Sequence, residues 1–279
     1  MKVAMCQTNI IWEDKEKNIE KCVEFIEQAK KHNIELMLFP EMSFTGFSMN
    51  INNTKENYNY TVQKISKIAR ENKIAIGFGW VEEMGHKARN KYTVVNSEGN
   101  VLADYAKIHP FSYSGEDKYF VSGASLSKFK FDNFTIGLLI CYDLRFPEIF
   151  QALSKECDAI VVAANWPASR KKHWKTLLKA RAIENQVYIF AINCVGKVGD
   201  LRYSGDSCII NPNGDVLSSL SKVEGMVIGD ITNDVKQYRS DFPTRKDRIP
   251  NQFLQATDQD PLWCQYHFQH PHYQLSFDP

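Results

Sequence analysis

The stretch Phe134–Phe150, FTIGLLICYDLRFPEIF, places a thiol between the pattern of a buried strand and the start of a helix. The apolar run Ile136–Ile140 is typical of a core strand. Pro147 is suited to the first turn of a helix that follows it. Cys141 is therefore expected at the carboxyl end of a strand and near a helix N-terminus, where backbone N–H groups and the helix dipole favour a thiolate and can bind an oxyanion. The alternative is an inert cysteine in the core.

Strand and helix patterns alternate along the rest of the chain in the same way. This alternation predicts an α/β layered fold in which helices cover mixed sheets. Within the first helix, one face is expected to carry Ile19, Cys22, Val23, Ile26 and Ala29. The predicted strands are 3–7, 36–39, 74–82, 92–96, 101–105, 136–140, 159–163 and 187–193; the predicted helices are 14–32, a segment around 62–69, 147–154 and 173–185; hairpins are expected to turn at 98–100 and 211–214.

Composition excludes several classes of protein. The chain has 279 residues, of which 43% are hydrophobic, so it can bury the core of one sizeable domain. A formal net charge of +1 gives no reason to expect nucleic acid or an acidic membrane as a partner. The absence of a leader-type or membrane-length apolar run predicts a cytoplasmic protein. The 7 cysteines show no C-x-x-C spacing, which indicates reduced thiols. The alternative of a nucleotide-binding oxidoreductase is disfavoured, because Gln7-Thr8-Asn9 follows the first strand where such a protein has a G-x-G-x-x-G motif.

Two other strand ends carry residues that can act together with a thiol. Glu41 follows the apolar run 36–39, and partial desolvation would raise its pKa toward the range of a general base; the alternative is a solvated turn glutamate. Lys107 follows the run 101–106, although most lysines are surface charges. A thiol, a base and a cation near the developing oxyanion are together what nucleophilic catalysis needs.

The segments FPE (39–41), YAKIHPF (105–111) and ICYDLRFPE (140–148) resemble those of the nitrilase, or carbon–nitrogen hydrolase, superfamily. They follow the order of its Glu-Lys-Cys triad, and the resemblance extends from about residue 1 to 247. It implies that Glu41, Lys107 and Cys141 are catalytic and that no cofactor or metal is required. It also implies a four-layer α-β-β-α sandwich with two mixed sheets, which pairs with a second copy into a homodimer.

Three further segments resemble bacterial omega-amidases, which hydrolyse the terminal amide of 2-oxo-dicarboxylic acid monoamides such as 2-oxoglutaramate. They are ANWPASRKKHWKTLLKARAIENQVYIFAINCVG (164–196), YSGDSCIINPNGDVL (203–217) and YRSDFPTRKD (238–247). An N-carbamoyl amine or aliphatic amide hydrolase with the same triad is the alternative. A non-catalytic binding protein that has kept the fold is a second alternative. In each case the expected ligand is a small molecule.

Several residues are expected to support the triad or to bind the substrate. Glu116 resembles the second glutamate of the family, which helps to position the lysine or a water, although its polar segment also fits a surface loop. The backbone N–H of Tyr142 is expected to help bind the oxyanion. Arg145 and Arg170 are candidates for a substrate carboxylate, and an internal ion pair with Asp143 or Glu148 is the alternative for Arg145. The pocket-lining candidates are Phe44, Tyr113, Asn165 and Trp166.

The C-terminal segment differs in composition from the rest. We expect a hydrolase domain over residues 1–250 and an extension over 251–279, which is rich in Gln, His, Asp and Pro. His267, His270 and His272 alone lack the ligand spacing of a metal site. A variable extension that packs across a neighbouring chain, or a segment of non-native origin, is the favoured interpretation.

Overall fold

The computed structural model describes residues 1–57 and 60–248. The contacts within the chain divide it into a unit Met1–Tyr238 and a second unit that begins at Arg239. The expected extension 251–279 and its three histidines lie outside the described residues. Every residue of the site described below belongs to Met1–Tyr238.

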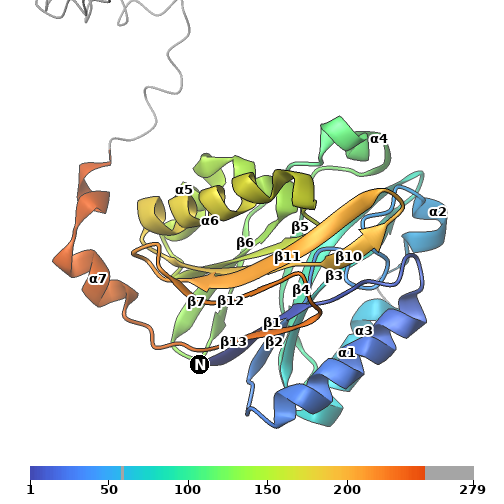
Figure 1. Cartoon of the computed structure of the whole chain (residues 1–279), viewed down its shortest axis with the longest axis horizontal. Coiled ribbons are helices and arrows are strands. Elements are labelled where there is room, and N and C mark those ends of the chain that lie inside the picture. Colours follow the sequence, from blue (N-terminus) through green and yellow to red (C-terminus); the bar gives the residue numbers. More distant parts are fainter. Residues whose placement is uncertain (58–59, 249–279) are drawn as a thin grey trace, which may run out of the picture. The chain divides into compact units, whose positions relative to one another are not determined.

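A first mixed sheet contains the N-terminal strand (Figure 1). β1 pairs in parallel with β2, which pairs in parallel with β3, while the remaining neighbours are antiparallel. Across the sheet the strands are β13 (Gly225–Asp230), β1 (Lys2–Gln7), β2 (Leu36–Leu38), β3 (Ala75–Met84), β4 (Lys87–Val95) and β5 (Val101–Ala106).

A second mixed sheet is built around three parallel strands, β7, β8 and β9. Its outer strands pair in antiparallel fashion, and β12 (Val216–Ser221) pairs with β11 beside the main path. Across the sheet the strands are β10 (Val195–Val198), β11 (Leu201–Ile210), β9 (Tyr188–Asn193), β8 (Ala159–Ala164), β7 (Phe134–Ile140) and β6 (Ser127–Phe131).

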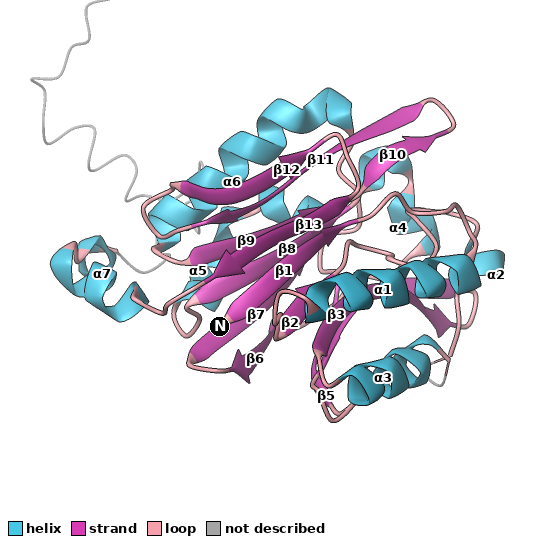
Figure 2. Ribbon diagram, turned by 60° about the horizontal axis from the view of Figure 1, so that its bottom comes forward, coloured by secondary structure: helices cyan, strands magenta, loops and turns pink. Residues whose placement is uncertain are grey.

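The two sheets pack face to face, and helices cover their outer faces (Figure 2). Because side chains alternate along a strand, Val3 and Met5 of β1 join a core shared with the second sheet, whereas Ala4 and Cys6 pack with the helices of the first sheet. The chain therefore forms the expected α-β-β-α sandwich. The covering helices are α1 (Lys15–Lys30) and α3 (Thr61–Asn72) on the first sheet, and α5 (Pro147–Ser154) and α6 (Lys171–Asn185) on the second.

Most predicted elements are confirmed, with small shifts at their ends. Val23 was wrongly expected on the buried face of α1, because it is 37% exposed and Phe25 is buried instead. At about 100° per residue, positions 23 and 25 lie at opposite edges of the apolar stripe formed by positions 19, 22, 26 and 29, and the buried face extends toward position 25.

The strands β6, β10 and β13 were not predicted. The short helices are α2 (Ile51–Thr54), α4 (Glu116–Tyr119) and α7 (Val235–Asp241). None of the helices in the described ranges has the length and apolarity needed to cross a bilayer.

Candidate active site

Four polar side chains follow the carboxyl ends of strands, three of them directly and Glu41 after two further residues. Glu41 follows β2, Lys107 follows β5, Cys141 follows β7 and Asn165 follows β8. The pairing directions make β2 and β5 run the same way in the first sheet, and β7 and β8 run the same way in the second. In α/β folds ligands bind outside the carboxyl ends of the strands. The two sheets bring these four residues together at such an edge.

Cys141 lies in a strained turn. Its φ of 45° is in the left-handed region, which is uncommon for a residue other than glycine and recurs at functional sites. Cys141 is the first residue of a 3₁₀ turn that ends at Arg145, and α5 begins only at Pro147. The buried carboxylate of Asp143 accepts a hydrogen bond of 3.0 Å from the Ile140 N–H, which closes the turn under the thiol.

The surroundings of Cys141 favour a neutral thiol and correct the expectation of a helix-stabilised thiolate. Burial raises the pKa of the Cys141 thiol well above its usual value, and the charge of Glu41 raises it further. The charge of Lys107 lowers this pKa, but the sum of the effects is a large increase. The expectation failed because the helix starts beyond the 3₁₀ turn, while a carboxylate lies beside the thiol. A thiol of this kind acts as a nucleophile only when a base takes its proton.

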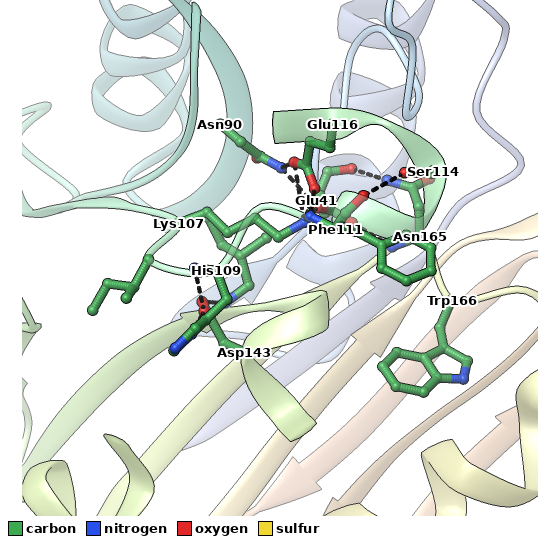
Figure 3. Close-up of polar contacts among 12 residues, drawn as sticks. Glu41, Asn90, Lys107, His109, Phe111, Ser114, Glu116, Asp143, Asn165 and Trp166 are labelled. Carbon is green, nitrogen blue, oxygen red and sulfur yellow. Dashed lines mark hydrogen bonds and ion pairs between the residues drawn. The ribbon is translucent and has the colours of Figure 1, made fainter. Parts of the chain in front are cut away.

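Glu41 is held in a fixed position by three elements. It is fully buried, so it is not the solvated turn residue that the sequence also allowed. Its Oε1 accepts hydrogen bonds from Lys107 Nζ at 2.8 Å and Asn90 Nδ2 at 2.7 Å. Its Oε2 accepts a hydrogen bond of 2.9 Å from the Asn165 N–H, and its backbone carbonyl accepts one of 2.6 Å from Asn165 Nδ2 (Figure 3). The carboxylate is thereby tied to both sheets.

Lys107 lies between two carboxylates. Besides Glu41, its Nζ contacts Glu116 Oε2 at 2.9 Å and Oε1 at 3.1 Å (Figure 3). Burial lowers the pKa of Lys107, but the charges of Glu116 and Glu41 outweigh it, so that the pKa is raised and the ammonium persists. Glu116 is fully buried rather than in a solvated loop, and burial raises its pKa despite the nearby Lys107. The Phe111 N–H donates to Glu116 Oε2 at 2.5 Å.

Comparison with known proteins identifies the family of the chain. The family model described as carbon-nitrogen hydrolase matches residues 2–240. The chain belongs to the carbon–nitrogen hydrolase family. It is 33% identical to a 2-oxoglutaramate amidase from Bacillus subtilis (strain 168), over 82% of this chain and 90% of the relative. It is 32% identical to a Staphylococcus aureus protein called hydrolase in agr operon, over 88% of this chain and 97% of the relative.

A solved structure shares the whole sandwich. It is a CN-hydrolase superfamily protein from Xanthomonas campestris with an arsenic adduct in its active site. The two structures superpose with a TM-score of 0.83 at 27% identity, covering 89% of this chain and 97% of the other. The present carbon–nitrogen hydrolase is accordingly an enzyme that acts on carbon–nitrogen bonds other than peptide bonds.

Asp143 connects the two strand ends that carry Lys107 and Cys141 in this carbon–nitrogen hydrolase. Its Oδ2 accepts a hydrogen bond of 2.8 Å from the Tyr105 hydroxyl. Its Oδ1 accepts one of 3.1 Å from the His109 N–H and lies 2.8 Å from His109 Nδ1 (Figure 3). This role of Asp143 was not predicted from the sequence. The only feature of the sequence that could have indicated this role is the position of Asp143 in a turn, two residues after the cysteine.

A cavity of about 200 Å³ opens beside Cys141. This volume is below the roughly 300–1,000 Å³ of pockets for drug-sized ligands, so the cavity suits a small metabolite. The candidates Tyr113, Arg145, Asn165, Trp166 and Arg170 all line it, and Tyr142 lines it as well. The lining residues that were not predicted from the sequence are Phe47, Phe111, Ser114, Pro167, Leu201 and Tyr203.

Phe44 was wrongly expected in this pocket. It is buried in the core between the first sheet and its helices, and its ring centroid lies 6.0 Å from that of Phe78. Phe47, three residues along the same turn, lines the cavity instead. The turn after β2 reverses the chain, so the order of residues in the sequence did not reveal which aromatic ring faces the thiol.

The two arginines of the cavity have no carboxylate partner in the described part of the chain. Arg145 lies over the rings of Trp166, at 4.9 Å, and Tyr142, at 5.9 Å. Arg170 lies over the Phe111 ring at 5.3 Å. The alternative of an ion pair between Arg145 and Asp143 is not realised, because Asp143 binds Tyr105 and His109. No Asp or Glu is among the lining residues, so the cavity favours an anionic ligand.

Proposed function

We propose that this enzyme is a cysteine-dependent amidase that hydrolyses the terminal amide of a 2-oxo-dicarboxylic acid monoamide such as 2-oxoglutaramate. The observation that carries the proposal is a small cavity with a thiol, a base and a cation at one place and two arginines without carboxylate partners in its wall. The substrate class has an amide at one end and a carboxylate at the other. The name of the Bacillus subtilis relative, 2-oxoglutaramate amidase, supports the same substrate.

In the proposed acylation step, the Cys141 sulfur attacks the amide carbon while Glu41 takes the thiol proton. The high pKa of this thiol means that the proton must leave during the attack. Lys107 and the backbone N–H of Tyr142 stabilise the oxyanion of the tetrahedral intermediate. Loss of one such donor typically costs about 3–4 kcal/mol in transition-state stabilisation.

In the proposed second half, Glu41 returns the proton to the nitrogen of the leaving group. The C–N bond breaks, ammonia departs and a thioester remains on Cys141. Water then attacks the thioester carbon, Glu41 accepts a proton from this water, and the thiolate leaves and is reprotonated. The net reaction consumes one amide and one water and yields one carboxylic acid and one ammonia. Glu116 keeps Lys107 charged and in place throughout.

The alternative substrates fit the cavity less well. An N-carbamoyl amine of the putrescine type carries a cation, whereas the lining has two guanidinium groups without carboxylate partners. A neutral aliphatic amide leaves both arginines without a partner. A non-catalytic binding protein would not need a strained cysteine beside a buried glutamate and lysine.

The deciding experiment is ammonia release from 2-oxoglutaramate, succinamate, glutamine and N-carbamoylputrescine by the wild type and by Cys141→Ala. We expect the oxo-amide to be the fastest substrate and the variant to be inactive. Faster turnover of the carbamoyl amine would replace the substrate assignment and keep the triad. If no substrate reacts although iodoacetamide still alkylates Cys141, the proposed substrate class is wrong.

We also propose that the chain acts as a homodimer in the cytoplasm. The dimer rests on the family resemblance, and light scattering on the purified chain measures its mass directly. The cytoplasmic location is supported by the cysteines, all of which are free within the described residues and most of which are buried. Fractionation of cells that express the tagged chain tests the location.

A further inference from the structure

We infer that Arg170 and Tyr203 together form the subsite that recognises the 2-oxo acid end of the substrate. Arg170 binds the carboxylate, and the Tyr203 hydroxyl donates a hydrogen bond to the neighbouring 2-oxo group. This inference rests on the proposed function and assigns specificity within the same cavity.

Tyr203 offers an unused hydrogen-bond donor to the cavity. It lies in β11, bridges Pro167 and is only 8% exposed. Its ring lines the cavity with Cys141, and no hydrogen bond of its hydroxyl is found among residues 1–57 and 60–248. Burial raises the pKa of the phenol, so the hydroxyl stays protonated at neutral pH. A hydroxyl group that belongs to a cavity-lining residue and has no protein partner is suited to a ligand.

Arg170 is the more available of the two arginines. Its backbone carbonyl accepts a hydrogen bond of 2.9 Å from Trp166 Nε1, which fixes the end of the turn Ala168–Arg170. Its guanidinium lies over the Phe111 ring, and no ion pair of this group is found in the described chain. The guanidinium of Arg145, by contrast, already packs against two rings and lies 3.4 Å from His173 Nδ1.

Arg170 and Tyr203 line the same cavity and can be matched to neighbouring groups of one ligand. Both line the cavity, and the charge of Arg170 opposes the increase in the pKa of Tyr203. A 2-oxo acid presents a carboxylate and a carbonyl oxygen on adjacent carbons. A guanidinium fork matches the carboxylate, and a phenol hydroxyl matches the carbonyl.

Three amide substrates of equal chain length distinguish the proposed contact of Arg170 from that of Tyr203. These are 2-oxoglutaramate, the monoamide of glutaric acid, which lacks the 2-oxo group, and pentanamide, which lacks both groups. The kcat/KM for each is measured with wild type, Tyr203→Phe, Arg170→Gln and Arg145→Gln. The matched controls are Tyr119→Phe and Arg202→Gln, because both residues are exposed and neither lines the cavity. Thermal unfolding and alkylation of Cys141 by iodoacetamide show that each variant is folded.

We expect Tyr203→Phe to lower kcat/KM for 2-oxoglutaramate by about 3- to 10-fold, the effect of one neutral hydrogen bond, and to spare the other two amides. Arg170→Gln is expected to lower kcat/KM by roughly 10- to 100-fold for both acids and to spare pentanamide. The controls should match the wild type with all three substrates.

The remaining outcomes overturn the assignment. If Tyr203→Phe slows all three amides equally, Tyr203 acts on the cysteine or on cavity shape and does not read the oxo group. If Arg145→Gln and not Arg170→Gln discriminates the acids, the carboxylate contact belongs to Arg145. If the wild type prefers 2-oxoglutaramate over the other two amides, and Tyr203→Phe and Arg170→Gln keep this preference in full, the subsite is refuted but the proposed function is not. A wild type with no preference for either acid refutes the proposed function as well.

Discussion

At the scale of single residues, the chemistry depends on how a few charges share a buried space. The Cys141 thiol lies near one ammonium, that of Lys107, and two carboxylates, those of Glu41 and Glu116. Burial and the carboxylates raise the thiol's pKa more than the ammonium lowers it. Proton transfer to Glu41 is thus part of the proposed reaction.

Glu41→Gln should separate reactivity of the thiol from catalysis. Removal of an anionic neighbour removes a factor that raises the pKa of Cys141, while Lys107 still lowers it. The pH profile of alkylation by iodoacetamide should therefore shift to lower pH. Amide hydrolysis should nevertheless fall by about 10²–10⁴-fold, because no group carries the proton to ammonia. Cys141→Ala corrects for the other cysteines. An unchanged alkylation profile would contradict the assigned role of the Glu41 charge.

Asp143→Asn should affect the turn of Cys141 and the segment of Lys107 together. The amide keeps the shape of the carboxylate but cannot accept from all of Ile140, Tyr105 and His109 at once. Loss of hydrogen bonds to a buried charged group typically costs about 1.5–3 kcal/mol of stability each.

For Asp143→Asn we expect a lower melting temperature and a fall in kcat larger than the change in KM. Asp215→Asn is the matched control, because the Asp215 carboxylate also accepts hydrogen bonds in a turn, from Asn211 Nδ2 and Asn213 Nδ2, but is exposed. A kcat for Asp143→Asn equal to that of the control would show that Asp143 does not position the site.

At the scale of elements, the turn after β2 is held against β3 at a glycine. The Ser43 N–H donates to the Gly79 carbonyl at 3.0 Å, and the Gly79 N–H donates to Ser43 Oγ at 2.9 Å. A Cβ at position 79 would lie 2.3 Å from the Met42 nitrogen and 2.8 Å from the Glu41 carbonyl carbon. Only glycine lets the Glu41 backbone lie this close to the strand.

Gly79→Ala should therefore displace Glu41, since the clash is with backbone. Gly77→Ala, on the same strand, is the matched control because its added Cβ meets mainly the side chains of Leu38 and Tyr92. Overpacking typically costs about 1–3 kcal/mol, so both variants should melt at lower temperature. Only Gly79→Ala should lose kcat when activity is measured per folded molecule. Equal kcat values in the two variants would refute the role of this close approach.

At the scale of the whole molecule, the site exists because two sheets contribute to it. Glu41 and Lys107 come from the first sheet, and Cys141 and Asn165 come from the second. The Asn165 contacts to Glu41 join them. All of these residues belong to the unit Met1–Tyr238.

A chain that ends at residue 250 should keep the activity of the full chain. The physical reason is that every contact described for the site is made within Met1–Tyr238. Measurement of kcat/KM for 2-oxoglutaramate, with light scattering on both chains, checks this expectation. A truncated chain that is folded but inactive would show that residues 251–279 complete a site, in the same chain or in a neighbouring one.

The sequence by itself determined the order and type of most elements, because period-2 and helical patterns are local properties of the chain. It also singled out Glu41, Lys107 and Cys141, since each stands where an apolar run ends. Strand β13 escaped prediction because it pairs with β1 from the other end of the chain. Strands β6 and β10 instead pair with the next strands in the sequence, β7 and β11, and their two-residue turns at 132–133 and 199–200 were not recognised as hairpins.

Only the tertiary structure decided the electrostatics and the shape of the site. The pKa of the Cys141 thiol is raised, and Glu116 is buried, because residues far apart in the sequence exclude water and place charges around them. Packing likewise decided that Phe47 and not Phe44 faces the cavity, and that Tyr203 enters it from β11. Burial and Coulomb energies depend on distances in space, and the spacing of residues along the chain does not contain those distances.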